Sequence, residues 1–215
     1  MTTRTWLCAL VFTLFAVLFP AQAQTQTQIQ AEIASAPELV RPLLNGLMVP
    51  DAQVQDSNGK TLSFTALTKG KPTLVLFYRG GWCPYCNAQL AGLQEIEAEL
   101  DNLGVQVLAL SPEPPERLKE GEGRGSYHLL SDRNLKAMQA FGLAYALDVP
   151  TASRYQGKMG DRLKVDEQQR VILPVPAAYL LDAEGRVQFS YVNPNFRVRV
   201  HPQLLLTAAR LMLAQ

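Results

Sequence analysis

The sequence predicts an α/β fold with a central mixed β-sheet flanked by helices. First, the apolar run PTLVLFY at 72–78 is typical of a strand buried on both faces. Second, a helical pattern follows it and leads to another buried strand, VQVLAL at 105–110, so these two strands should be parallel. Third, AAYLLDAEGRVQFSYV at 177–192 predicts two strands around a turn, and residues 201–214 predict a C-terminal helix.

The segments between these elements contain further predicted strands, helices and turns. AQVQDSNGKTLSF at 52–64 predicts two short strands around a turn at Asn58-Gly59. Residues 127–132 predict another strand, and Asp132 is expected to cap the helix that follows it. Residues 150–172 are irregular and polar, and are predicted to form an inserted hairpin or loop. After the cysteine pair, apolar residues recur at spacings of three and four and predict a helix with one apolar face, which Gly104 ends. These residues are Leu90, Leu93, Ile96, Leu100 and Leu103.

The first residues have the pattern of a secretory signal peptide. Arg4 precedes an apolar stretch of 14 residues, and Ala21 and Ala23 follow at the spacing of a cleavage site. We expect residues 1–23 to be a signal peptide, with an uncleaved anchor as the alternative. We expect 24–44 to be a flexible linker and 45–215 to be one domain. The sequence thus predicts secretion across the inner membrane, into the periplasm.

The overall charge excludes some partners. The chain of 215 residues is 47% hydrophobic and has a formal net charge of +1. This composition predicts one globular domain, and the near-neutral charge favours neither a nucleic-acid partner nor an anionic membrane surface.

The chemistry centres on a pair of cysteines. Cys8 leaves with the signal peptide, so the mature chain keeps only Cys83 and Cys86. Pro84 is typical of the first turn of a helix, which places the Cys83 sulfur over unpaired backbone N–H groups. Such a position lowers a thiol pKa below its ordinary value of about 8.5. We therefore predict that Cys83 is the nucleophile and that Cys86, one helical turn later, resolves its adducts.

Other roles for the pair fit less well. A structural disulfide here would close a minimal loop, which contributes little to stability. A zinc site needs about four ligands, and His128 and His201 lack ligand spacing to the cysteines. Covalent haem attachment needs histidine after the second cysteine, where the chain has Asn87. No metal or organic cofactor is expected.

The motifs resemble a known family. FYRGGWCPYC at 77–86 is followed by LALSPE, LLSD, LPVPAAYLLDAEG and NPNFRVRVHP, in the order found in the peroxiredoxin-like branch of the alkyl hydroperoxide reductase/thiol-specific antioxidant family. The resemblance covers residues 45–210, and residues 82–86 also resemble the active-site turn of thioredoxins and glutaredoxins. It implies a thioredoxin-like fold with extra N-terminal strands. It also implies a thiol oxidoreductase that cycles Cys83 and Cys86 between dithiol and disulfide to reduce disulfides or peroxides.

The resemblance extends to two further residues and to the partners. Pro176 matches the cis-proline that faces the cysteines in thioredoxin-like folds, although a trans proline opening an edge strand remains the alternative. Arg199 matches an arginine that recurs in the peroxiredoxin-like branch, with a solvated surface arginine as its alternative. The implied reductant is an external dithiol, either a thioredoxin-like protein or a small thiol.

One departure from the family leaves the function open. Typical peroxiredoxins have Pro-x-x-x-Thr/Ser-x-x-Cys, and counting back from Cys83 gives Gly80 and Leu76. The hydroxyl that helps to hold the peroxide is therefore absent. A dedicated peroxidase with an external dithiol donor is one alternative. A Cu(I) metallochaperone, using both thiolates with His128 or His201, is an alternative from another class.

Overall fold

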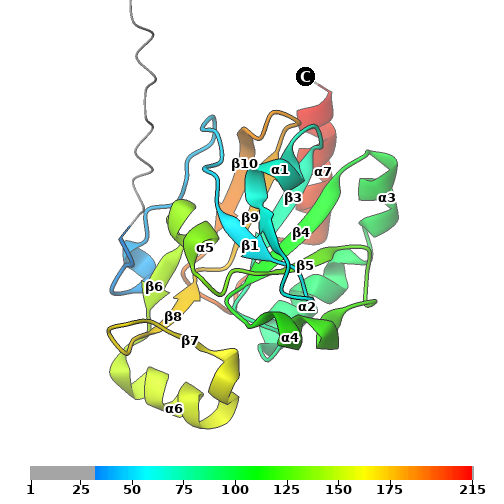
Figure 1. The fold of residues 1–215 in the computed structure, drawn as a ribbon. Coiled ribbons are helices and arrows are strands. Elements are labelled where there is room, and N and C mark those ends of the chain that lie inside the picture. Colours follow the sequence, from blue (N-terminus) through cyan, green and yellow to red (C-terminus); the bar gives the residue numbers. More distant parts are fainter. Residues whose placement is uncertain (1–31, 215) are drawn as a thin grey trace, which may run out of the picture.

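A seven-stranded mixed sheet forms the centre of the protein. The computed structural model describes residues 32–214, and its strands lie in the order β10-β9-β3-β4-β5-β1-β2 (Figure 1). Strands β3, β4 and β5 are parallel, and the other neighbours are antiparallel. The bounds are β1 Gln53–Gln55, β2 Thr61–Ser63, β3 Thr73–Phe77, β4 Gln106–Ser111, β5 His128–Ser131, β9 Ala177–Leu181 and β10 Val187–Val192. The predicted central mixed sheet, its parallel pair and its two N-terminal strands are confirmed.

Helices cover both faces of this sheet, which explains why every residue of β3 is buried. Val75 and Phe77 pack into one core with α1 (Phe64–Thr68) and α5 (Lys136–Ala140). Leu74 and Leu76 point the other way, into a second core. Helices α2 (Pro84–Leu93), α3 (Glu97–Asn102) and α7 (Pro202–Leu213) cover that side. In Figure 1, α5 lies in front of the sheet and α7 behind it.

The helix predicted to run to Gly104 is broken. Helix α2 ends at Leu93 and α3 begins at Glu97. Between them, Ile96 leaves helical geometry with φ −116° and ψ 1°. Ile96 and Leu100 are nevertheless buried in the same core as Leu93. The apolar spacing therefore predicted the common buried face correctly, but it did not predict the break in the helix.

The predicted irregular insertion contains a second small sheet and a helix. Strands β6 (Ala144–Ala146), β8 (Val171–Pro174) and β7 (Lys164–Val165) pair in that order, and α6 (Val149–Met159) and a 3-10 turn, η3 (Gly160–Arg162), precede β7. The Asp148 carboxylate accepts a 2.9 Å hydrogen bond from the Thr151 amide, and proline stands in the first turn of α6. These are strong helix-start signals that the polar composition concealed.

The chain packs against the domain before residue 45, where the sequence places the domain boundary. The Ala34 amide donates to the Ala144 carbonyl (3.0 Å), and the Leu43 amide donates to the Phe141 carbonyl (3.0 Å). A 3-10 turn, η1 (Pro37–Leu39), lies in this segment. The predicted signal peptide and residues 24–31 of the predicted linker lie outside the described residues. Within residues 32–214, none of the helices is long and apolar enough to cross a membrane.

Asp132 organises the start of α5. Its two carboxylate oxygens accept hydrogen bonds from the amides of Ala137 (2.9 Å) and Met138 (2.8 Å). The predicted capping role is thus confirmed, although the helix itself begins at Lys136. Burial raises the pKa of Asp132 to about 7, against the opposing effect of these amides.

Replacing Asp132 by alanine should destabilise the protein. The variant leaves two buried amides without an acceptor, so the free energy of unfolding should fall by about 1–2 kcal/mol. Urea unfolding at neutral pH measures this change. Asp132→Asn keeps one acceptor oxygen and should lose less stability. A stability of Asp132→Ala equal to that of the parent protein would contradict the capping role.

Candidate active site

The cysteine pair lies where a parallel strand passes into a helix. Strand β3 ends at Phe77 and α2 begins at Pro84, with Cys83 as the N-cap residue. The Cys83 amide donates to the Gly80 carbonyl at 3.1 Å, which closes the connecting turn. The predicted start of the helix at Cys83 and Pro84 is confirmed. The Cys83 side chain therefore lies at the positive end of the α2 dipole.

Gly80 has no room for a side chain. Its φ of +143° lies in a region that residues other than glycine rarely adopt. A Cβ atom there would overlap the Trp82 indole and lie 2.9 Å from Cδ of Glu113. The turn therefore excludes a threonine or serine at the position where typical peroxiredoxins carry the hydroxyl, three residues before Cys83.

The two thiols share one proton unequally. Both sulfurs are buried, with Cys83 only 1% exposed. The hydrogen bond from the Cys86 thiol lowers the pKa of Cys83 to about 6, overcoming the effect of burial. The Cys86 amide and the charges of Arg79 and Arg199 act in the same direction. That hydrogen bond and burial both raise the pKa of Cys86, so the dithiol form holds a thiolate at Cys83 and a thiol at Cys86.

Alkylation should report this asymmetry. We expect the rate at which iodoacetamide modifies Cys83 to rise with pH around a midpoint near 6, because only the thiolate reacts. In Cys86→Ala the stabilising hydrogen bond is lost and the midpoint should move upward. Mass spectrometry of the modified peptide follows the rate at each pH. A midpoint at the ordinary thiol value in the parent protein would refute the assignment.

Arg79 is a buried residue of the active-site turn that the sequence analysis missed. Its side chain is 2% exposed, and its guanidinium carbon lies 4.2 Å from the ring centroid of Phe196. Trp82 and Tyr155 contribute two more rings, at 5.1 and 5.2 Å. From sequence alone, an arginine directly after a strand is usually interpreted as a solvated surface residue. The only available signal was its place in the turn leading to Cys83.

Arg199 reaches the pair through Cys86. One guanidinium nitrogen, Nη2, lies 3.4 Å from the Cys86 sulfur. The other, Nη1, donates to the carbonyl of Val198 at 2.8 Å and to that of Phe196. The structure thus brings Arg199 into the site and places it directly on the predicted resolving thiol.

The predicted cis peptide at Pro176 is wrong. No cis peptide bond occurs among residues 32–214. Pro176 immediately precedes β9, whose Ala177 pairs with Phe77, so it lies beside the end of β3 after which the cysteines follow. The chain passes from β8 to β9 through Val175 and Pro176 alone. The trans form is the ordinary preference of prolyl bonds.

Glu113 supplies a buried acid from a neighbouring strand. The acid often found in the strand before the active-site turn of thioredoxins is absent from β3. Glu113, just beyond β4, is 1% exposed, and its Oε2 accepts a 2.6 Å hydrogen bond from the Gly81 amide. Its Oε1 pairs with Arg162 at 2.8 Å. Burial raises the pKa of Glu113, and these two contacts oppose the rise.

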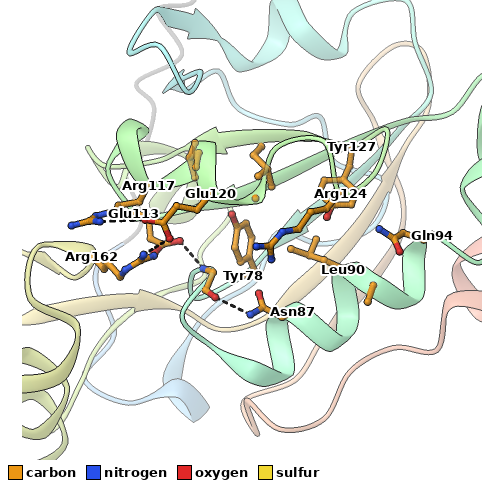
Figure 2. A pocket seen from close by; sticks show the side chains of 15 residues that line it. Tyr78, Asn87, Leu90, Gln94, Glu113, Arg117, Glu120, Arg124, Tyr127 and Arg162 are labelled. Atoms are coloured by element: carbon orange, nitrogen blue, oxygen red, sulfur yellow. Dashed lines mark hydrogen bonds and ion pairs between the residues drawn. The ribbon is translucent and has the colours of Figure 1, made fainter.

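A pocket of about 270 Å³ adjoins the turn (Figure 2). One wall is the face of α2 that carries Asn87 and Leu90, with Gln94 just after the helix. The opposite wall includes α4 (Pro115–Leu118) and a 3-10 turn, η2 (Lys119–Gly121). The side-chain amide nitrogen of Asn87, Nδ2, donates to the Gly81 carbonyl at 2.8 Å. The pocket therefore shares the active-site turn, although neither cysteine lines it.

The two histidines lie at the start of β5 and at the start of α7. His128 is exposed and pairs with Leu108. Leu108 lies three residues before the end of β4, and the cysteines follow β3 beyond that same end of the sheet. The His201 side chain is the N-cap of α7 and accepts a hydrogen bond from the Gln203 amide. Within residues 32–214, no three histidine, cysteine or acidic side chains form a cluster that fits a metal ion. The geometry thus offers the Cu(I) alternative no third histidine, cysteine or acidic ligand among these residues.

Known proteins are similar to this chain in sequence. Residues 46–190 match the model of the AhpC/TSA family. Peroxiredoxin Bcp of Escherichia coli is 27% identical over 169 residues, which cover 78% of this chain and 96% of that protein. Chloroplastic peroxiredoxin Q of Triticum aestivum is 26% identical over 156 residues, covering 73% of this chain and 62% of that protein.

Solved structures agree on the fold. Reduced Prx3 of Vibrio vulnificus in complex with hydrogen peroxide has a TM-score of 0.62 at 18% identity and covers 78% of this chain and 99% of its own. Peroxidoxin BcpB of Mycobacterium tuberculosis has a TM-score of 0.61 at 18% identity, covering 78% and 97%. The predicted thioredoxin-like fold is confirmed. The chain belongs to the AhpC/TSA family and is a thiol-based oxidoreductase of the peroxiredoxin-like type.

Proposed function

We propose that the protein is a thiol peroxidase in which Cys83 attacks the peroxide and Cys86 resolves the product. The observation that carries this proposal is the thiolate–thiol pair at the N-terminus of α2, with the pKa of Cys83 lowered and that of Cys86 raised. The relatives support the substrate class, because the Escherichia coli protein is named a peroxiredoxin and the Vibrio vulnificus structure contains hydrogen peroxide.

The reaction proceeds in two steps within the pair. The Cys83 thiolate attacks one peroxide oxygen, the O–O bond breaks, and the leaving oxygen takes a proton and departs as water or an alcohol. Cys83 is then a sulfenic acid. The Cys86 sulfur attacks the Cys83 sulfur, forms the disulfide and releases the sulfenic oxygen as a second water, which carries away the thiol proton.

The residues around the pair have separate roles in these steps. The Cys86 thiol, the Cys86 amide and the nearby guanidinium groups stabilise the Cys83 thiolate before attack. Arg199, which contacts the Cys86 sulfur, favours its deprotonation when Cys86 in turn becomes the nucleophile. Glu113 holds the Gly81 amide and so fixes the turn on which Cys83 is mounted.

An external dithiol must complete the cycle, and we propose a thioredoxin-like protein or a small thiol for this role. We further propose that the protein carries out this reaction in the periplasm. The supporting observation is the apolar stretch of 14 residues followed by Ala21 and Ala23. A mature chain that begins at Gln24 in the periplasmic fraction would support this location, and a cytoplasmic chain that retains Met1 would contradict it.

Stopped-flow kinetics test the peroxidase proposal. The reduced protein should consume hydrogen peroxide or an organic hydroperoxide in one equivalent, at a rate at least about 10²-fold above that of a free thiol at the same pH. With excess dithiol donor, consumption should continue through many turnovers. A rate no greater than that of the free thiol would refute the peroxidase.

A second candidate is dithiol–disulfide exchange with proteins. The turn around Gly80 excludes the hydroxyl that typical peroxiredoxins use, and it places both thiols on one helix as in thioredoxins. Reduction of insulin disulfides by the protein, with no rapid loss of peroxide, would favour this function over the first.

A further inference from the structure

At one end of the pocket beside the active-site turn, the charged side chains are paired with each other (Figure 2). Arg162 pairs with Glu113 at 2.8 Å and also with Glu120. Arg117 pairs with Glu120 at 3.2 Å and with Asp161 at 3.0 Å. Each cation at this end is therefore already balanced by carboxylates, so this end offers no strong attraction for a further anion.

The opposite end carries an arginine without an acidic partner. Arg124 forms no ion pair within residues 32–214, and its side chain points into the pocket in Figure 2. Tyr127 and Gln94 lie at the same end. Burial raises the pKa of Tyr127, so its hydroxyl remains a hydrogen-bond donor at neutral pH, and the Gln94 side chain offers a further donor. One permanent cation beside two neutral donors is an arrangement that suits a carboxylate.

The rest of the lining is largely apolar. Its apolar and aromatic side chains are Tyr78, Leu90, Ala91, Leu118 and Leu129. The volume of about 270 Å³ lies just below the range of about 300–1,000 Å³ that is typical of small-molecule sites. A ligand that fits this pocket should therefore be small and should combine an apolar body with a single anionic group.

The pocket also contacts the residue that anchors the active-site turn. Gly81, two positions before Cys83, is part of the lining. Its amide donates to Oε2 of Glu113 at 2.6 Å, and its carbonyl accepts from Nδ2 of Asn87 at 2.8 Å. Both of these side chains line the pocket as well. A ligand in the pocket therefore lies among the groups that hold the turn.

We propose that this pocket is a binding site for a small amphipathic carboxylate. The carboxylate lies against Arg124 and the neutral donors beside it, and the apolar body lies along the face of α2 that carries Leu90 and Ala91. The ligand binds apart from the two cysteines, which do not line the pocket. Because Gly81 lines the same pocket, occupancy changes the surroundings of the active-site turn. This binding site is additional to the proposed peroxidase reaction and does not depend on it.

Titration of the reduced protein with hexanoate, followed in amide NMR spectra, tests the site. Hexanoate is ionised at neutral pH, hexanol has the same chain without the charge, and hexylammonium has the opposite charge. We expect hexanoate to bind at least about tenfold more tightly than hexanol, because a charge-assisted hydrogen bond to Arg124 is added, and hexylammonium to bind most weakly. The amide resonances of Gly81 and Gln94 should shift during the titration. Equal affinities for hexanoate and hexanol, or shifts confined to residues outside the pocket, would overturn the proposal.

Substitution of Arg124 tests the position of the carboxylate. Arg124→Met removes the charge and keeps a long apolar side chain. It should lower the affinity for hexanoate by about tenfold and change that for hexanol little, so that the two ligands bind alike. Arg154→Met is the matched control, because Arg154 is an exposed arginine of α6 that does not line the pocket, and its loss should leave both affinities unchanged. An Arg124→Met protein that still prefers hexanoate to hexanol as strongly as the parent would contradict the assignment.

A space-filling variant tests the apolar part of the site. Ala91 is exposed on α2 and lines the pocket, so Ala91→Phe places a ring in the pocket without disturbing the core. We expect it to weaken the binding of hexanoate and hexanol alike, and parent-like binding of both ligands would count against the pocket as their site. These titrations use neither a peroxide nor a reaction of the thiols. Failure of the peroxidase assay would therefore leave the binding result intact, and absence of binding would overturn this proposal alone.

Discussion

Replacing Cys83 by serine is expected to reduce peroxide consumption by at least about 10³-fold, to the level of the buffer with donor alone. A serine hydroxyl is not ionised at neutral pH, so it cannot replace the thiolate as the nucleophile. The measurement is the steady-state loss of hydrogen peroxide with an excess of dithiol donor. Cys83→Ser should remain folded, because the thiol and the hydroxyl are close in size.

Cys86→Ser is the matched variant for this experiment. It should lose turnover but retain the first chemical step, consuming one equivalent of peroxide, because the attacking thiolate is still present. The contact between Arg199 and the Cys86 sulfur makes the comparison decisive. If Cys86→Ser loses the first step and Cys83→Ser keeps it, the roles of the two thiols are reversed.

Gly80→Ala is expected to produce the second large effect. The new methyl group would overlap the Trp82 indole and press on Glu113, on a backbone with φ of +143°. Strain at such a φ costs about 1–3 kcal/mol, and overpacking adds a similar amount, so the free energy of unfolding should fall by about 2–6 kcal/mol. Urea unfolding measures the change. Gly80→Thr should fare no better, and the hydroxyl should not improve peroxidase activity.

The neighbouring glycine provides the control. A Cβ atom at Gly81 would lie 3.5 Å from Oε2 of Glu113, an ordinary contact, and Gly81 has no positive φ. Gly81→Ala should therefore lose much less stability than Gly80→Ala. Equal stabilities for the two variants would show that the turn tolerates a side chain at Gly80, and the structural reason for the missing hydroxyl would fail.

Local signals in the sequence were sufficient to predict the core of the site. The apolar run ending at Tyr78, the glycines that follow it and the proline after Cys83 all act within a few residues, so the strand–turn–helix geometry follows from them directly. The parallel pairing of β3 and β4 then follows from the short helical connection. The capping role of Asp132 is another local effect that the sequence displayed.

The residues that were missed act through tertiary contacts. Arg79 is buried only because rings from the turn, α6 and the loop around Phe196 close over it. Glu113 is 32 positions away from Gly81 in the sequence, and no periodic pattern connects the two. The cis peptide expected at Pro176 came from resemblance rather than from a local signal, and the connection between β8 and β9 accommodates the trans form.

The most direct test of the central claim is to locate the first oxidised sulfur. Cys86→Ser, reduced and then treated with one equivalent of hydrogen peroxide in the presence of dimedone, should carry the label at Cys83, as shown by mass spectrometry of the proteolytic peptides. The parent protein under the same treatment should instead yield the Cys83–Cys86 disulfide. A Cys86→Ser protein that consumes no peroxide and carries no label at Cys83 would contradict the account.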